Sequence, residues 1–184
     1  MSEYRDRHPV VPEVGRAIVL PGRKYGPGKP LLVAVADVLL ARGWAVREVR
    51  WELPDGLSDR RVTAWVTDQA RSAATGWADR PLVVGKSLGS RAASYATKRR
   101  LDAVWLTPLL LDKTVARAIG RSRARQLLVG GTADDLAWDG AVARSTGADV
   151  LELAGADHSL RVKDDPERST AYLDRLRRAV DAWL

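Results

Sequence analysis

Ser87 has the surroundings that point most directly to chemistry in this chain. Residues 85–89 read Gly-Lys-Ser-Leu-Gly, a match to the pattern G-x-S-x-G. A short apolar run at 82–84 precedes the match, and a stretch rich in small residues at 88–96 follows it. This pattern predicts a buried strand, a tight turn and a helix. A serine at such a turn has a strained backbone and a hydroxyl clear of the sheet, so Ser87 is the candidate nucleophile.

The histidines supply one candidate base for this serine. A serine hydroxyl is a weak nucleophile unless a base takes its proton as it attacks a carbonyl carbon. The chain has two histidines. His8 lies in a charged N-terminal stretch without periodicity, whereas His158 follows the apolar run at 149–153. His158, in a loop after the last expected strand, is therefore the candidate base.

Several carboxylates follow the expected strand at 126–130. Asp134 and Asp135 are the nearest, and Asp139 lies further along the chain. Because functional side chains gather at the carboxyl ends of the strands in an open α/β sheet, these carboxylates are candidates to fix the tautomer of the histidine. Asp157 adjoins the histidine in sequence, which is a poor position from which to accept a hydrogen bond from its ring.

The elements that must position these groups alternate along the chain. Strands are predicted at 16–20, 44–51, 82–84, 103–107, 126–130 and 149–153. Helices are predicted at 31–42, 62–73, 88–96 and 135–146, within 109–119, and at the C-terminal end. Such alternation implies parallel pairing through right-handed crossovers. The predicted fold class is α/β: a three-layer sandwich whose mostly parallel sheet of about six strands has helices on both faces.

The domain organisation follows from length and composition. A chain of 184 residues suits one domain. Residues 1–15 are rich in charge and proline, and we predict an N-terminal tail or edge segment there. Residues 16–184 form the predicted domain.

Three loops give the sequence a resemblance to the α/β-hydrolase family from residue 16 onward. The loops 85–89, 131–135 and 155–160 resemble the nucleophile, acid and histidine loops of that family, in the same chain order. The resemblance favours Asp134 as the acid and leaves Asp135 as a helix cap or as the alternative acid. The chain is most similar to small, dienelactone-hydrolase-like members without a cap. It departs from dienelactone hydrolase itself in having Ser rather than Cys as nucleophile.

An oxyanion hole is expected from two main-chain amides. One is the amide of Leu88, the residue after the nucleophile. The other is the amide of Arg23, because residues 21–23 resemble the His-Gly-x loop of the family, with Pro21 in place of His. The alternative is that residues 22–30 are an ordinary connection rich in turn residues.

Two residues are candidates for substrate binding. Lys86 adjoins the nucleophile and favours an anionic acyl substrate, although a charge facing solvent is the alternative. Trp138, like Trp77, is a candidate to line a cleft. The alternative is that tryptophan is a general core residue here, because the chain has seven Trp and no Phe.

Other classes of function fit the sequence poorly. A P-loop ending at residues 85–87 would need glycine where Arg80 stands, and residues 22–30 have the wrong spacing. The formal net charge of +7 is spread along the chain without a nucleic-acid-binding motif, so no specific nucleic acid is expected. With no cysteine, disulfides and thiolate metal sites are excluded. Neither a signal peptide nor a membrane-spanning run is visible, which favours a soluble, cytoplasmic protein.

The sequence therefore predicts a serine hydrolase that cleaves carboxylic esters or thioesters through an acyl-enzyme. Its catalytic residues are Ser87, Asp134 and His158, and it needs no metal and no cofactor. The expected partner is a small-molecule acyl substrate, and the protein is a monomer or a homodimer. The alternative is a non-catalytic protein of the same fold that binds a partner.

Overall fold

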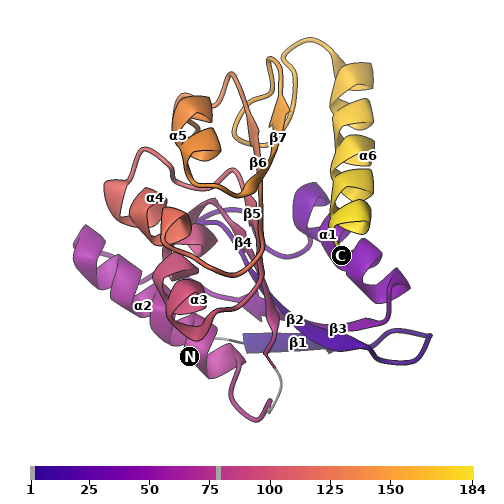
Figure 1. The fold of residues 1–184 in the computed structure, drawn as a ribbon, viewed down its shortest axis with the longest axis vertical. Helices are drawn as coiled ribbons and strands as arrows, with labels where there is room; N and C mark the ends of the chain where they lie inside the picture. The colour runs from indigo at the N-terminus through magenta and orange to yellow at the C-terminus, as the bar shows by residue number, and fades with distance from the viewer. Residues whose placement is uncertain (1–2, 78–79) are drawn as a thin grey trace.

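A sheet of seven strands runs through the middle of the molecule, in the order β1-β3-β2-β4-β5-β6-β7 (Figure 1). The computed structural model describes residues 3–77 and 80–184. Strand β1 pairs antiparallel with β3, and the other neighbouring strands pair in parallel. The strands are β1 Glu3–Arg7, β2 Gly15–Leu20, β3 Trp44–Arg50, β4 Leu82–Lys86, β5 Ala103–Leu106, β6 Gln126–Gly131 and β7 Asp149–Leu153.

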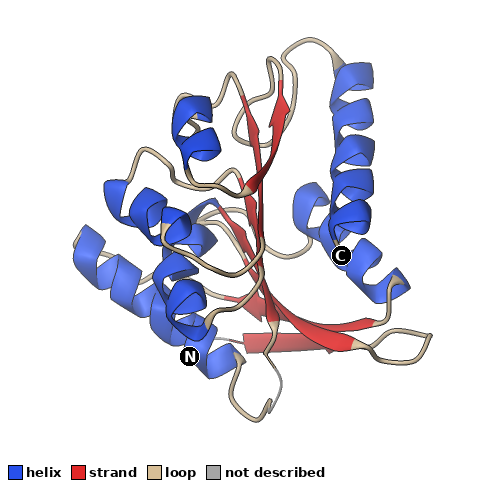
Figure 2. Cartoon of the chain, viewed as in Figure 1, coloured by secondary structure: helices blue, strands red, loops and turns tan. Residues whose placement is uncertain are grey.

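Helices cover both faces of the sheet, which confirms the predicted three-layer α/β architecture. Helices α1 and α6 lie together on one face, and α2 to α5 lie on the other (Figure 2). A 3-10 turn at Ser87–Ala92 separates β4 from α3. The helices are α1 Pro30–Ala41, α2 Asp59–Ala73, α3 Ala93–Arg99, α4 Lys113–Gly120, α5 Gly140–Ser145 and α6 Pro166–Trp183.

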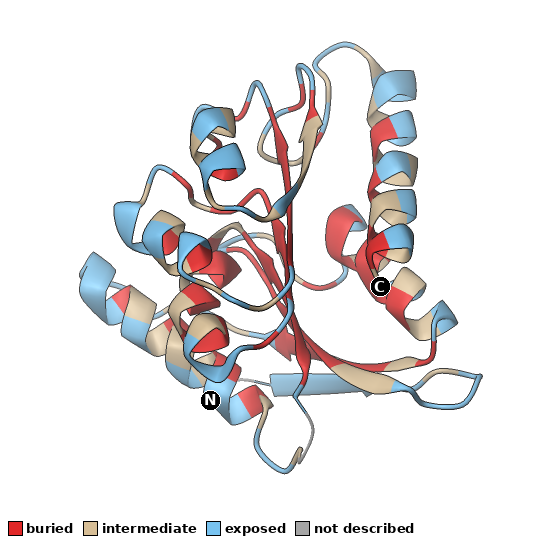
Figure 3. Ribbon diagram, viewed as in Figure 1, coloured by how far each residue is buried: buried red, intermediate tan, exposed pale blue. Residues whose placement is uncertain are grey.

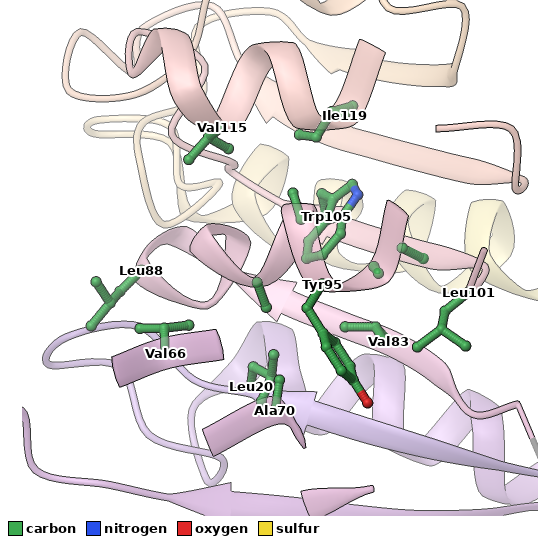
Figure 4. Close-up of a cluster of buried hydrophobic side chains, with 14 of the residues drawn as sticks. Leu20, Val66, Ala70, Val83, Leu88, Tyr95, Leu101, Trp105, Val115 and Ile119 are labelled. Carbon is green, nitrogen blue, oxygen red and sulfur yellow. The ribbon is translucent and has the colours of Figure 1, made fainter. Parts of the chain in front are cut away.

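Each face of the sheet has its own hydrophobic core. The central strands β4, β5 and β6 are buried throughout, as expected for parallel strands covered on both sides, whereas the edge strand β1 is mostly exposed (Figure 3). Figure 4 shows part of the core on the face of α2 to α5, where Leu88 packs among side chains that include Val66 and Trp105. The indole of Trp105 is fully buried, and its N–H donates to Oε1 of Gln126 at 2.9 Å. Leu88, which follows Ser87, therefore fixes the turn after β4 to this hydrophobic core.

The structure differs from the sequence prediction at three elements. The helix predicted at 88–96 is a 3-10 turn at Ser87–Ala92 followed by α3 at Ala93–Arg99. The sheet has one strand more than the six we expected, because residues 3–7 of the N-terminal segment form β1 at the edge of the sheet. Helix α5 begins at Gly140 rather than at 135, because the carboxylate of Asp139 accepts from the amide of Val142 and caps the helix there. Asp135 is therefore not the helix cap, which corrects that prediction.

The described residues contain neither a helix able to span a membrane nor a cluster of metal-ligating side chains. None of their helices combines the length and apolar character needed to cross a membrane. In the same part of the chain, no cluster of three or more His, Cys, Asp or Glu side chains is arranged to hold a metal ion.

Candidate active site

Ser87 lies at the carboxyl end of β4 in a strained conformation. Its φ is 49°, in the left-handed region that non-glycine residues seldom adopt. The flanking glycines make the turn possible. A Cβ on Gly85 would lie 2.6 Å from the ring of Trp105. A Cβ on Gly89 would lie 2.6 Å from the carbonyl oxygen of Leu20. The backbone thus has the tight strand-to-helix turn that the motif predicts.

Ser87, His158 and Asp134 meet at the carboxyl edge of the sheet. Nε2 of His158 lies 2.8 Å from Oγ of Ser87. Nδ1 of the same ring lies 2.7 Å from Oδ2 of Asp134. Because an ionised carboxylate only accepts hydrogen bonds, we assign the ring proton to Nδ1, which leaves Nε2 to accept from the serine hydroxyl. The loops after β4, β6 and β7 therefore bring together a hydroxyl, a base and a carboxylate in the order of a proton relay.

The burial of Asp134 suits a carboxylate that orients the ring. Its side chain has no exposed surface, whereas that of His158 is 23% exposed. A buried carboxylate needs hydrogen bonds to offset the loss of water. Asp134 has two, from Nδ1 of His158 and from the amide of Leu136, whose nitrogen lies 3.2 Å from Oδ1. The ring is thus fixed by a fully buried carboxylate, while part of the histidine side chain stays accessible to solvent.

The alternative carboxylates do not contact the histidine ring. Asp135 is exposed, and Asp139 caps α5. Asp157 accepts from the amides of residues 159 and 161, at 2.7 and 2.9 Å. Of the candidates that the sequence left open, the geometry therefore favours Asp134.

Two main-chain amides beside Ser87 are free to donate. A Cβ on Gly22 would lie 3.6 Å from Cβ of Ser87, so the loop after β2 runs directly against the serine. Within residues 3–77 and 80–184, the amides of Arg23 and Leu88 have no hydrogen-bond acceptor. They are the two amides that the sequence indicated as an oxyanion hole, and that role stays a prediction.

Ser90 supports the turn, and the sequence analysis missed it. It is fully buried, and its Oγ donates to the carbonyl oxygen of Ser87 at 2.6 Å. The same Oγ accepts from the amide of Leu109 at 3.1 Å. The strained residue is thereby tied to the segment that follows β5. The sequence shows only that Ser90 belongs to a stretch rich in small residues, which gives no sign of these hydrogen bonds.

The position of Lys86 contradicts both sequence predictions, that it binds substrate and that its charge faces solvent. It is 1% exposed, so its charge faces neither solvent nor an open cleft. Its Nζ donates to the carbonyl oxygen of His158 at 3.0 Å and lies 5.0 Å from the centre of the Tyr25 ring. The last residue of β4 thus points beneath the histidine loop rather than toward a substrate.

Trp138 is a core residue rather than a cleft residue, which corrects its assignment to substrate binding. It is 8% exposed, and its Nε1 donates to Oε2 of Glu152 at 2.8 Å. Its ring lies so close to β6 that a Cβ on Gly130 would be 1.9 Å away. The ring of Trp77 contacts Arg47, whose guanidinium carbon lies 4.5 Å from the ring centre, in a cation–π interaction.

Two open hollows flank the loop after β2. One, of about 700 Å³, lies between this loop, the start of α1, the segment after His158 and the first turns of α6. The other, of about 360 Å³, is lined by residues 21–28 with Arg50 and Trp51. Lys24 and Tyr25 line both hollows. A small molecule therefore has room on either side of the loop that approaches Ser87.

Comparison with known proteins identifies the fold. No protein-family model matches the sequence, and no curated protein is significantly similar to it. Solved structures, in contrast, match nearly the whole chain. Est1E from Butyrivibrio proteoclasticus is 14% identical, with a TM-score of 0.78 and coverage of 99% of this chain and 92% of Est1E. Another structure of Est1E contains bound ferulic acid.

Two further structures match at a similar level. XC6422 from Xanthomonas campestris, an α/β serine hydrolase without a lid, is 16% identical, with a TM-score of 0.65 and coverage of 100% and 89% of the two chains. A dienelactone hydrolase from Anabaena variabilis is 16% identical, with a TM-score of 0.64 and coverage of 96% and 89%. The chain therefore has the α/β-hydrolase fold, in a small form without a lid.

Proposed function

We propose that this protein is a serine hydrolase that cleaves carboxylic ester or thioester bonds through an acyl-enzyme. Ser87 is the nucleophile, His158 the general base and acid, and Asp134 the carboxylate that orients the imidazole. The observation that carries the proposal is the continuous contact from Oγ of Ser87 to Nε2 of His158, at 2.8 Å, and from Nδ1 to Asp134, at 2.7 Å. Hydrogen bonds that serve structure alone would not need Ser87 to lie on a strained turn, whereas catalysis by its hydroxyl explains the strain.

The proposed reaction has two halves. In the first, Oγ of Ser87 attacks the acyl carbon while Nε2 of His158 takes its proton, and the imidazolium then gives that proton to the leaving alkoxide or thiolate. In the second, water attacks the acyl-enzyme, His158 takes a proton from the water, and Ser87 regains its proton as the carboxylic acid leaves. The amides of Leu88 and Arg23 are the proposed donors to the oxyanion in both halves. No step uses a metal or an organic cofactor.

Carboxylic esters are the first substrates to test. Est1E shares this fold, and ferulic acid, the ligand bound to it, is a carboxylic acid of the kind that ester hydrolysis releases. The two hollows beside the loop after β2, of about 700 and 360 Å³, are not lined by Ser87, His158 or Asp134 themselves. They border neighbouring residues, Ser159 in the larger and Gly22 and Arg23 in the smaller, so we propose them as places for the parts of a substrate that lie away from the scissile bond. Thioesters have the same acyl carbon and follow as the second class.

A fluorophosphonate probe tests the proposal without knowledge of the substrate. We expect the probe to label the native protein and to leave the Ser87→Ala variant unlabelled. Hydrolysis of p-nitrophenyl esters and acyl thioesters of increasing chain length then identifies the preferred acyl group. If the folded native protein is not labelled, the nucleophile assignment is wrong and the non-catalytic binding protein becomes the better hypothesis.

A further inference from the structure

Lys86 is a buried charge that the proposed mechanism does not use. It ends β4 and is 1% exposed, although lysine is among the residues that proteins bury least. Within the described chain its ammonium group takes part in no ion pair of the kind that usually accompanies a buried charge. Removing an ammonium group from water is costly, so this position calls for an explanation other than packing.

The surroundings of Lys86 all belong to the candidate active site. Its Nζ donates to the carbonyl oxygen of His158 at 3.0 Å. The ring of Tyr25 lies 5.0 Å away, within the range of a cation–π interaction. The carboxylates of Asp134 and Asp157 are close enough to favour the charged form. Burial is the stronger influence and lowers the pKa of Lys86 from 10.5 to about 8, so the side chain is still largely charged at pH 7.

The main chain of the histidine loop has one hydrogen bond to another part of the described protein between residues 157 and 161. Among the described residues, the main-chain hydrogen bonds of residues 157–161 are made within that segment, from the amides of 157 and 160 to carbonyl oxygens and from the amides of 159 and 161 to the Asp157 carboxylate. The exception is the carbonyl of His158, which accepts from Lys86. Leu160 has a φ of 56°, so the backbone of the loop is itself strained.

We propose that Lys86 is a positioning residue, which fastens the main chain of His158 to the strand that carries Ser87 and so holds Nε2 at the serine hydroxyl. The inference rests on the proposed function, since it assigns a role in the same reaction. The end of β4 then positions both groups. The backbone after β4 holds Ser87, and the side chain of Lys86, the last residue of β4, holds the main chain of His158. Small displacements of a catalytic group can cost about a hundredfold in rate, so one hydrogen bond at this place matters.

The test is a set of substitutions measured with a fluorophosphonate probe and with p-nitrophenyl acetate. Lys86→Met removes the donor and keeps a chain of similar length, and Lys86→Arg keeps a charged donor. Lys98→Met, at an exposed lysine near the end of α3, is the matched control. We expect Lys86→Met to lower kcat and the labelling rate more than tenfold with KM changed less than twofold. Lys86→Arg should recover part of that loss, and Lys98→Met should match the native protein.

Other results would assign Lys86 differently. A loss of activity confined to KM would mean that Lys86 binds substrate, and a folded Lys86→Met variant with native kinetics would mean that it has no role in positioning. Either result overturns the inference and leaves the proposed function intact. Absence of labelling in the native protein overturns both. If Lys86→Met does not fold, Lys86→Gln, which is polar but too short to reach the carbonyl, is judged by the same criteria.

Discussion

Charged side chains are buried both at the β1–β3 edge of the sheet and at the carboxyl end of β4, but their contacts differ. At the sheet edge formed by β1 and β3, Glu48 is 4% exposed and meets the guanidinium of Arg7 at 3.2 Å. Arg7 also pairs with Asp37, at 2.9 Å. At the carboxyl end of β4, Lys86 is 1% exposed and donates to a neutral carbonyl, that of His158. One buried charge is in direct contact with its counter-charge, whereas Asp134 and Asp157 act on the other without a direct ion pair among the described residues.

The difference separates a structural site from a candidate functional site. Arg7 joins β1 to β3 through Glu48 and to α1 through Asp37, and the fold alone accounts for these pairs. The unpaired charge of Lys86 lies in the same place as the strained backbone of Ser87 and the buried carboxylate of Asp134. Strain and buried polar groups of this kind oppose stability and are concentrated at functional sites. If the comparison is right, substitutions at the β4 end should affect activity, and substitutions at the β1–β3 edge should affect stability alone.

The largest expected effect is on turnover, from Ser87→Ala and His158→Ala. Each should lower kcat/KM for a p-nitrophenyl ester by about a thousandfold or more, and the double variant should be no worse than either, because the two residues act as a unit. Thermal unfolding should show that both variants remain folded. A variant that retained more than a tenth of the native rate would remove that residue from the mechanism.

The next effect concerns the choice of carboxylate. Asp134→Asn should lower kcat by about a hundredfold or more. An amide can donate to Nδ1 as well as accept from it, so it does not fix the required tautomer, and it has no charge to stabilise the imidazolium. Asp135→Asn is the matched control, at an exposed neighbour without contact to the ring, and should leave kcat unchanged. The reverse pattern in steady-state kinetics would show that the acid loop rearranges when substrate binds.

The central sheet, Ser87 and His158 could be predicted from local sequence patterns, whereas the preference for Asp134 over Asp135 came from the resemblance to a known family. Apolar runs at β4, β6 and β7 are followed by loops with chemically distinctive residues, and parallel strands place such loops at one edge. Strand β1 could not be predicted in this way. Its residues are Glu-Tyr-Arg-Asp-Arg, and it is held by partners on β3 such as Arg47, 41 positions from Asp6.

The role of Lys86 also depends on contacts distant in sequence. A lysine beside a nucleophile is expected to face solvent or substrate, since lysine is seldom buried. Its burial depends on a loop 72 positions later that folds over the end of β4. Tyr25 is another contact distant in sequence from Lys86. Its ring covers the Lys86 ammonium, and its hydroxyl accepts from the amide of Leu31.

A smaller effect is expected on the pH dependence of stability at Lys86. Burial lowers its pKa to about 8, from 10.5 for the unfolded chain. Below pH 8 both states carry the proton, so the buried charge opposes folding fully. Between pH 8 and 10.5 the unfolded state binds more protons, so the free energy of unfolding of the native protein should rise relative to that of Lys86→Met, by up to about 3 kcal/mol. Urea unfolding of both proteins at pH 7 and pH 10 measures this difference, with Lys98→Met as control.

Urea unfolding of Lys86→Met also tests whether Lys86 differs from the charged residues of the β1–β3 edge in its effect on stability. If Lys86→Met were much less stable than the native protein at pH 7, with no pH-dependent difference between them, Lys86 would be a stabilising residue like those of the β1–β3 edge. We expect the opposite, because replacing a buried charge that lacks an ionic partner by an apolar side chain is often neutral or stabilising.

The smallest effect is expected at the β1–β3 edge itself. Asp6 accepts from Nε and Nη2 of Arg47 in a bidentate pair, with both distances 2.8 Å. The hydrogen bond from Arg47 is the main cause that holds the pKa of Asp6 below its usual value of 3.8. Because the Asp6 side chain is 41% exposed, Asp6→Asn should cost no more than about 1 kcal/mol at pH 7.

The pH dependence at Asp6 has the same sign as that at Lys86, because both pKa values are lowered in the folded state, but it falls in the acid range and the ionised group is stabilising. A carboxylate with a lowered pKa in the folded state stabilises the protein above pH 3.8, and that contribution is lost as the pH falls through the folded-state value. The difference in stability between the native protein and Asp6→Asn should therefore shrink in strong acid, as measured by urea unfolding. Ester hydrolysis at pH 7 should be unchanged in Asp6→Asn, because the pair fastens β1 to β3, at the edge of the sheet beyond β2 and β4. A fall in kcat in this variant would show that the edge of the sheet and the end of β4 are coupled, and the division between the two regions would then be wrong.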